Sequence, residues 1–193
     1  YDTYAFFLMK SRGIKNREFI YKSWKEFTDK VRAGTEPNLL SLYIHFSYCQ
    51  SSCDYCVYPS VSLKNEKQIG DYIDFLIKEM EYFSPLFTGL KFKTLSIGGG
   101  TPSLMNEKQL KKLLDKMFTY FKFEQNGEKS IEFNPNSTTM EKLKIIESFG
   151  FNKLSIGVQS LSPKVLQIIN RDYQTIEKIK QTVANFKKTK IGF

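Results

Sequence analysis

The sequence predicts an α/β fold built on a parallel β-sheet. From residue 40 onward, extended apolar runs alternate with segments in which apolar residues recur at helical spacing. Repeated strand–helix units of this kind imply parallel strands joined by right-handed crossovers. A chain of 193 residues is also long enough to bury one sizeable core. We therefore expect one α/β domain over residues 40–193, preceded by an extension over residues 1–39.

The first two units follow from the apolar pattern. Residues 40–46 (LSLYIHF) form the first expected strand, and apolar residues over 69–83 mark the face of a helix behind it. Residues 93–99 (KTLSIGG) form the second strand, followed by a helix whose apolar face spans 110–121.

The third strand is expected at 130–135 (SIEFNP). Its helix should open with Thr138 and Glu141, which have the spacing of a capping box. The same helix should close at Gly150, because glycine is favoured just past a helix C-terminus.

The fourth strand is expected at 152–160 (NKLSIGVQS). A short helix should follow over 162–170, since a serine–proline pair is typical of a helix start. A longer helix is expected over 175–187, and 190–193 (KIGF) should begin a fifth strand. The sheet is thus expected to hold four βα units and the start of a fifth strand.

Residues 1–39 differ from this pattern. A polar helix is expected around 18–31, and Gly34 and Pro37 should break the chain after it. We expect this extension to pack on the sheet or to cover the site, and it carries no residues that indicate chemistry.

Composition excludes several classes of function. The net charge of +9 comes largely from lysines on the polar sides of expected helices, and arginine clusters are absent, so nucleic-acid binding is not expected. No apolar run is long enough to span a bilayer. Clustered cysteines without a secretory signal indicate a reducing compartment, and we therefore expect a cytoplasmic protein.

All three cysteines lie within eight positions, as Cys49, Cys53 and Cys56 with the spacing C-x3-C-x2-C. A structural zinc site usually takes four ligands, and His45 is available as the fourth, although we interpret it as a scaffold residue of its strand. Three thiolates suit an iron–sulfur cluster with one iron open to another ligand. The spacing therefore favours a cluster, with a cysteine–zinc module as the alternative.

Three further stretches follow the cysteines in order: GGGTPS at 98–103, SIEFNP at 130–135 and LSIGVQSLSPKVLQIINR at 154–171. Together with LYIHFSYCQSSCDYC at 42–56, they resemble the radical S-adenosylmethionine (SAM) family. More closely, the set is similar to the oxygen-independent coproporphyrinogen III oxidases and their relatives, which include a heme chaperone and some methyltransferases. The resemblance covers roughly residues 40–193.

The resemblance implies a fold, two cofactors and partners. The fold would be a partial (βα)-barrel of the radical SAM type, cut off after the start of its fifth strand. The cofactors would be a [4Fe–4S] cluster on the three cysteines and SAM on the open iron. An electron donor such as flavodoxin or ferredoxin would reduce the cluster, and the resulting 5′-deoxyadenosyl radical would act on a small molecule, in the oxidases a tetrapyrrole propionate. We expect the chain to be the N-terminal part of a longer protein, weak in SAM binding and turnover by itself.

The resemblance and the residue chemistry together suggest the cofactor contacts. Arg171 can pair with the SAM carboxylate, Glu132 would contact SAM, and the Gln159 amide suits ribose hydroxyls. Glycines after the second strand would remove side chains where the backbone must approach a ligand. The remaining expected contacts are Tyr43, Tyr55, Gly99, Gly100 and Thr101.

Two positions depart from the family pattern. Ser47 stands where the relatives typically have proline, and Tyr58 stands where the oxidases often have a fourth cysteine. The stretch 158–166 is closer to the chaperone branch, whereas 170–171 resembles the oxidases. Oxidase, heme chaperone and methyltransferase therefore stay open as alternatives.

Overall fold

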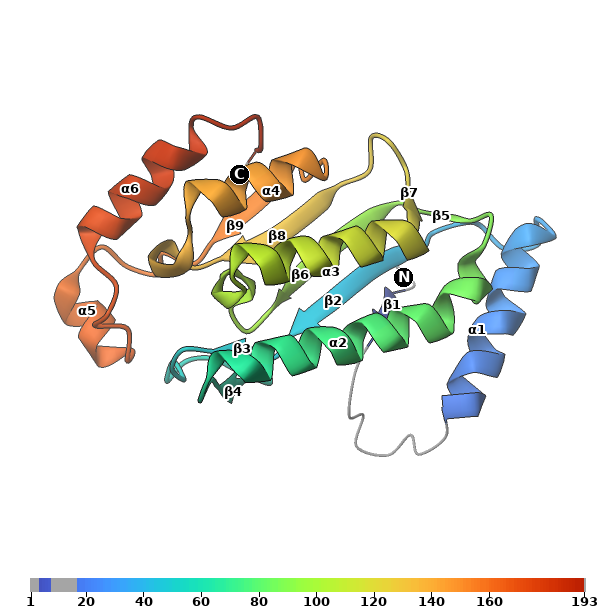
Figure 1. The fold of residues 1–193 in the computed structure, drawn as a ribbon, viewed down its shortest axis with the longest axis horizontal. Helices are drawn as coiled ribbons and strands as arrows, with labels where there is room; N and C mark the ends of the chain where they lie inside the picture. Colours follow the sequence, from blue (N-terminus) through green and yellow to red (C-terminus); the bar gives the residue numbers. More distant parts are fainter. Residues whose placement is uncertain (1–3, 8–16, 193) are drawn as a thin grey trace.

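The computed structural model describes residues 4–7 and 17–192 (Figure 1). A five-stranded sheet forms its centre, and every neighbouring pair of strands in it is parallel. In spatial order the strands are β1 (Tyr4–Phe7), β2 (Ser41–Phe46), β6 (Thr94–Gly99), β8 (Lys129–Phe133) and β9 (Lys153–Ile156). The predicted α/β fold with a parallel sheet is confirmed.

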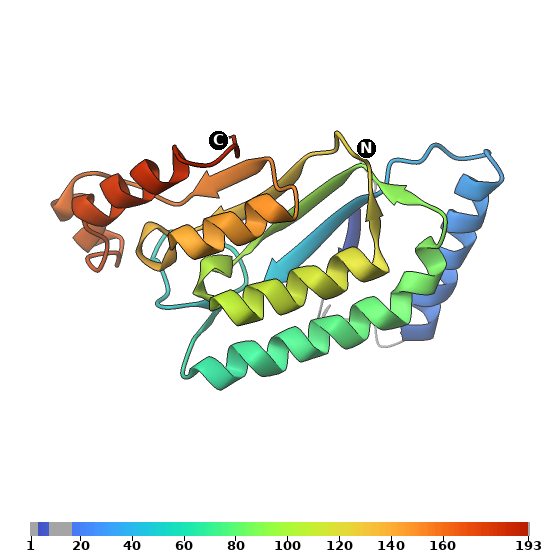
Figure 2. The ribbon, with the colours of Figure 1, turned by 45° about the horizontal axis from the view of Figure 1, so that its top comes forward.

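Helices connect the strands. They are α1 (Arg17–Arg32), α2 (Glu66–Phe83), α3 (Glu107–Tyr120), α4 (Met140–Ser148), α5 (Pro163–Ile168) and α6 (Ile176–Phe186). Figures 1 and 2 show α2, α3 and α4 side by side along one face of the sheet. Asn65 and Asn106 close complete capping boxes at the starts of α2 and α3, which satisfies backbone N–H groups there.

Short elements complete the architecture. Two small parallel ladders pair β3 (Tyr48–Cys49) with β4 (Val61–Ser62) and β5 (Lys91–Phe92) with β7 (Lys122–Phe123). Single 3₁₀ turns are η1 (Ser84–Phe87), η2 (Pro102–Leu104) and η3 (Pro135–Ser137). The last two directly follow β6 and β8, at the carboxyl edge of the sheet.

The two faces of the sheet differ in chemistry. The face toward the helices buries aliphatic side chains completely, among them Ile44, Leu95 and Ile131. On the other face, the strand register aligns a row of less buried side chains: Tyr43, Ser96, Ser130 and Lys153. This alternation is the period of two expected for strands with one apolar face. It leaves a polar face free for a site.

Two boundaries differ from the sequence prediction. The third strand stops at Phe133 because Pro135 opens the turn η3. The N-cap of α4 is Thr139 rather than Thr138: the Thr139 hydroxyl accepts from the Lys142 N–H, while the Thr138 hydroxyl donates to the Asn134 carbonyl. Both threonines could cap the helix, but the Thr138 hydroxyl is already bonded to the turn η3, so Thr139 becomes the N-cap.

The fourth strand is shorter than predicted, and the fifth begins as expected. β9 ends at Ile156, and the chain then turns away, with Gln159 in the left-handed region at φ +62°. Gly192 forms a parallel bridge to Lys153, and Ile191 is buried beside it. The last residue of the predicted segment 190–193 lies outside the described residues.

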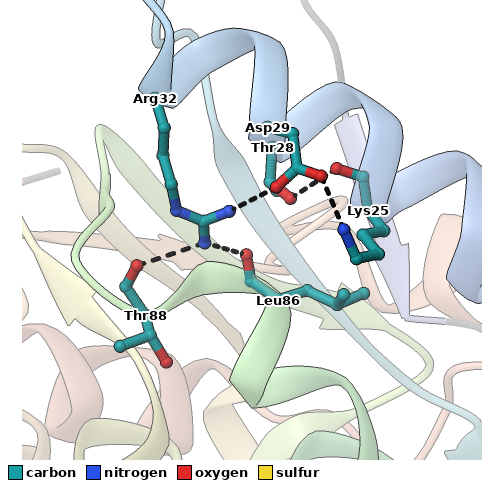
Figure 3. A network of polar contacts seen from close by, with 6 residues as sticks. All are labelled: Lys25, Thr28, Asp29, Arg32, Leu86 and Thr88. Carbon is teal, nitrogen blue, oxygen red and sulfur yellow. Dashed lines mark hydrogen bonds and ion pairs between the residues drawn. The ribbon is translucent and has the colours of Figure 1, made fainter.

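The N-terminal segment adds a strand that the sequence prediction missed. β1 pairs with β2 in parallel, at the edge of the sheet. The predicted polar helix is present as α1, and Figure 1 shows it at the end of the sheet away from α5. Arg32 fastens it there by donating from Nη2 to the carbonyls of Leu86 (2.6 Å) and Thr88 (3.2 Å), while its Nη1 donates to Asp29 within the same helix (Figure 3). None of the helices in the described part of the chain has the length and apolar character needed for a membrane span.

Candidate functional site

A cavity of about 250 Å³ lies at the carboxyl edge of the sheet. Residues that follow or end β2, β6, β8 and β9 line it, together with the turn after α5. It brings together every predicted site residue except Tyr43: Cys49, Cys53, Tyr55, Cys56, Gly99, Gly100, Thr101, Glu132, Gln159 and Arg171. The parallel topology thus brings these residues together in one site at the ends of the strands.

The cysteines are carried by β3 and the loop after it. All three are free thiols, and Cys56 is exposed. At the base of the loop, the Leu63 N–H donates a hydrogen bond to the Cys49 carbonyl at 2.8 Å. Within the loop, the Cys56 N–H donates to the Cys53 carbonyl at 3.0 Å. The Thr101 hydroxyl donates to the Cys49 sulfur at 3.6 Å. This sulfur therefore has a hydrogen-bond donor from a different strand end.

The glycine run at the end of β6 is required by its protein neighbours. A Cβ at Gly99, whose φ is +105°, would lie 2.5 Å from the His45 ring, and a Cβ at Gly100 would lie 2.5 Å from the Tyr48 carbonyl oxygen. The Gly100 N–H donates to the Phe46 carbonyl at 2.6 Å. The glycines therefore let this turn press against the chain leading into the cysteine loop. This close approach is to protein, whereas we expected an approach to a ligand.

His45 is a buried scaffold residue, as expected. Its Nε2 lies 2.8 Å from the Pro59 carbonyl, and its Nδ1 lies 3.1 Å from the Tyr43 hydroxyl. A carbonyl can only accept, so Nε2 carries a proton, and in the neutral ring Nδ1 accepts from the Tyr43 hydroxyl. Both ring nitrogens are thus engaged in supporting the exit of the cysteine loop.

Tyr43 does not line the cavity. Its hydroxyl is hydrogen-bonded to His45 Nδ1 instead, and burial, together with the nearby Glu132 charge, raises the pKa of Tyr43 to about 12. Tyr43 therefore contacts His45, the residue that is hydrogen-bonded to the exit of the cysteine loop, and not the cavity itself. A role in direct cofactor contact remains a prediction.

All three cysteines line the cavity. No group of three His, Cys, Asp or Glu side chains within residues 4–7 and 17–192 is placed so that it could hold one metal ion. A single zinc ion draws its sulfur ligands to about 2.3 Å from one point. A cluster takes each thiolate on a different iron, so its ligands lie farther apart. Three cysteines supply one thiolate for each of three irons of a cluster, which is one ligand short of the four of a structural zinc site.

Glu132 extends from β8 on the open face of the sheet. Its carboxylate packs against Gly98, where a Cβ would come within 2.9 Å of the Glu132 Cδ. Partial burial raises the pKa of the Glu132 carboxyl above its ordinary value, although the Gly99 N–H and the His45 ring lower it in part. No cation of the described chain forms an ion pair with it. The carboxylate is suited to a cationic or N–H donor group of a ligand.

Arg171 is buried, with 6% of its surface exposed, yet its guanidinium reaches the cavity. Nη1 donates to the Gly157 carbonyl at 2.9 Å, and Nε donates to the Tyr173 hydroxyl at 3.3 Å. Nη2 makes no hydrogen bond to the described residues. A fixed guanidinium with free donors is a typical binding group for a carboxylate.

The cavity also contains residues that sequence reasoning missed. Ser51 is one of them, and its hydroxyl is buried without a hydrogen-bond partner in the described chain, which marks a place for a ligand atom. Several others directly follow a strand or a predicted contact, so adjacency could have identified them. The missed lining residues are Ser51, Tyr58, Phe133, Asn134, Ser155, Gly157 and Tyr173.

Comparison with protein families gives one match over most of the chain. Residues 43–192 match the family model described as the radical SAM superfamily. Among curated proteins, the oxygen-independent coproporphyrinogen III oxidase of Escherichia coli (strain K12) is 33% identical over 69% of this chain and 29% of its own length. The heme chaperone HemW of the same organism is 35% identical over 68% of this chain and 35% of its own length. The chain thus spans about a third of these relatives.

Solved structures agree on the fold. The structure of coproporphyrinogen III oxidase (HemN) from Escherichia coli, described as a radical SAM enzyme, matches with a TM-score of 0.72 and 31% identity over 77% of this chain and 34% of that one. A radical SAM methyltransferase, TsrM from Kitasatospora setae, matches with a TM-score of 0.52 and 14% identity over 77% of this chain and 29% of that one. At that identity the second match concerns the fold alone.

Proposed function

The chain belongs to the radical SAM superfamily, whose members use a [4Fe–4S] cluster and SAM, and we propose that Cys49, Cys53 and Cys56 hold the cluster beside a SAM site in the cavity. One observation carries the proposal: three unpaired cysteines and the polar groups that SAM would need line a single cavity. When bound, the cluster and SAM supply one-electron cleavage of a C–S bond and a radical able to abstract hydrogen.

The residues around the cavity fit these groups. All three thiols line the cavity, the Ser51 hydroxyl has no hydrogen-bond partner among the described residues, and Nη2 of Arg171 makes no hydrogen bond to them. We assign Arg171 to the SAM carboxylate and Glu132 to its α-amino group, because each has the charge that its partner requires. Gln159, Gly99, Gly100 and Tyr55 would contact the rest of the ligand.

For the whole protein we propose radical chemistry on a tetrapyrrole, as the similarity to the coproporphyrinogen III oxidases suggests. The similarity to heme chaperones favours a second candidate, in which the same cofactor site accompanies heme binding. The chain's net charge of +9 supports an acidic electron donor such as a flavodoxin or ferredoxin. Three free cysteines support a reducing, cytoplasmic location.

Two assays on the reconstituted whole protein, rather than on this chain alone, distinguish the candidates. An enzyme of the first kind should release 5′-deoxyadenosine and consume coproporphyrinogen III when it is given a reductant and SAM. A chaperone should instead bind heme stoichiometrically in a titration. Heme binding without consumption of the porphyrinogen would contradict the oxidase proposal, and the reverse result would contradict the chaperone.

Replacing Thr101 with valine should make the cluster harder to reduce. The Thr101 hydroxyl donates to the Cys49 sulfur, and such hydrogen bonds stabilise the more negative, reduced state. Loss of about 0.5–1.5 kcal/mol corresponds to a potential lower by roughly 20–60 mV. A redox titration measures the shift, and Thr101→Ser, which keeps the hydroxyl, is the control. Equal potentials for wild type and T101V would remove this role.

SAM affinity should depend on pH through Glu132. The pKa of this carboxyl is raised, and the ionised form is the one that attracts the SAM α-amino group, so affinity should weaken as the pH falls through the raised pKa. Glu132→Gln should bind more weakly at neutral pH and lose that part of the pH dependence. Calorimetric titrations across the pH range measure both effects. A pH profile that is identical in E132Q and wild type would place the amino group elsewhere.

A further inference from the structure

The tip of the cysteine loop is tied to the rest of the molecule at one point. We define the cysteine loop as residues 50–58, which carry Cys53 and Cys56. Its base is fixed by the ladder between β3 and β4. Within the described chain, the hydrogen bond that joins residues 50–58 to another part of the molecule runs from Asn170 Nδ2 to the Ser52 carbonyl, at 2.7 Å. These two residues are 118 positions apart in the sequence.

Asn170 is suited to this position by its backbone. It ends the turn after α5 with φ +58°, a left-handed conformation that asparagine tolerates better than most residues. The Asn170 N–H donates to the Gln167 carbonyl at 3.2 Å, and the Arg171 N–H donates to the Leu166 carbonyl at 2.7 Å. The turn is therefore fixed on both sides of Asn170, and its amide is held toward the loop.

The same turn carries Arg171. The guanidinium of Arg171 is anchored to the Gly157 carbonyl and lines the cavity, directly next in sequence to the residue that holds the loop. A ligand that fixes Arg171 also fixes this turn. Conversely, opening of the loop breaks a bond to the turn. Cluster ligands and the proposed SAM carboxylate contact are thus joined through two adjacent residues.

We propose that Asn170 is a positioning residue that couples the cysteine loop to Arg171, so that bound SAM protects the cluster against loss. This inference rests on the proposed function, because it requires a cluster on Cys53 and Cys56 and SAM at Arg171. Asn170 itself need not touch either cofactor. Its bond to Ser52 keeps the loop closed, and SAM strengthens that closure through the shared turn.

Two variants distinguish the contribution of the Asn170 side-chain amide from that of its left-handed backbone. Asn170→Gly keeps the left-handed conformation and removes the side chain. Asn170→Asp keeps the shape, but its carboxylate cannot donate to the Ser52 carbonyl. Gln167→Ala is the matched control, because Gln167 is exposed on α5 and only its backbone contacts Asn170.

The experiment follows iron release from the anaerobically reconstituted protein to a chelator, with and without saturating SAM. In wild type and Q167A, SAM should slow release. In N170G and N170D, release without SAM should be about three- to tenfold faster, the range expected for one lost hydrogen bond. The protection factor given by SAM should shrink toward one, while the melting temperature of the cluster-free protein stays unchanged.

The outcomes distinguish the inference from the function. If wild type takes up no cluster, or takes up a cluster but shows no SAM binding in a calorimetric titration, the proposed function fails. If wild type binds SAM without slower iron release, the inference fails and the proposed function stands. If wild type is protected and N170G and N170D release iron at its rate, Asn170 does not hold the loop. Faster release with an unchanged protection factor would also overturn the inference, because it would show a structural role without coupling.

Discussion

Replacing Cys49, Cys53 or Cys56 with alanine should each abolish cluster binding in the reconstituted chain. The chain has no fourth cysteine to substitute, and both His45 ring nitrogens are already engaged. An iron that has lost its thiolate would therefore find neither a spare cysteine nor a free His45 nitrogen, and thiolates are the usual ligands of such clusters. We expect near-complete loss of iron, sulfide and the brown charge-transfer absorption.

Ser52→Ala is the matched control for these variants. Ser52 lies between two of the cysteines and is exposed, and the contact made by this residue is through its backbone carbonyl, which the substitution keeps. It should retain the full cluster. Stoichiometric zinc without iron uptake in the wild type would support the cysteine–zinc alternative instead.

Arg171→Ala should weaken SAM binding roughly ten- to hundredfold, because a lost charge-assisted hydrogen bond typically costs ~1.5–3 kcal/mol. Cluster content should be unchanged, since Arg171 is not a ligand. The buried position of Arg171 makes the effect specific: its Nη1 and Nε bonds hold the guanidinium in place, and Nη2 stays available. Calorimetric titration with SAM measures the change.

Two further variants test the geometry of that contact. Lys164→Ala removes an equal charge from an exposed position on α5, and it should leave SAM affinity nearly unchanged. Arg171→Lys keeps the charge but loses the planar pair of donors, so its affinity should fall between wild type and R171A. Equal SAM titrations for R171A and wild type would remove Arg171 from the site.

Much of the fold could be predicted because its signals are local. The apolar spacing within α2 and the alternating burial of β2 each lie inside one segment, and parallel topology then places the strand ends together. Cys49, Glu132 and Gln159 lie at or just after the ends of three of these strands, so the parallel topology brings them together although they are far apart in sequence. The site followed from the topology once the strands were recognised.

The remaining features depend on contacts between distant segments. β1 has only four residues, and nothing in them identifies β2 as its partner. Tyr43 faces the site side of β2, yet its hydroxyl bonds to His45, which the spacing alone does not indicate. The hydrogen bond from Asn170 to Ser52 joins residues that are 118 positions apart in the sequence, and it depends on the left-handed backbone of Asn170. Such pairings are set by the packed structure.

The central claim is that one cavity holds both a [4Fe–4S] cluster and SAM. Electron paramagnetic resonance of the anaerobically reconstituted, reduced chain, recorded with and without saturating SAM, tests it most directly. The account predicts the signal of a reduced [4Fe–4S] cluster that changes when SAM is added to wild type, and that needs a roughly ten- to hundredfold higher SAM concentration to change in R171A. A chain without such a signal, or with a cluster signal that SAM leaves unaltered in wild type, would contradict it.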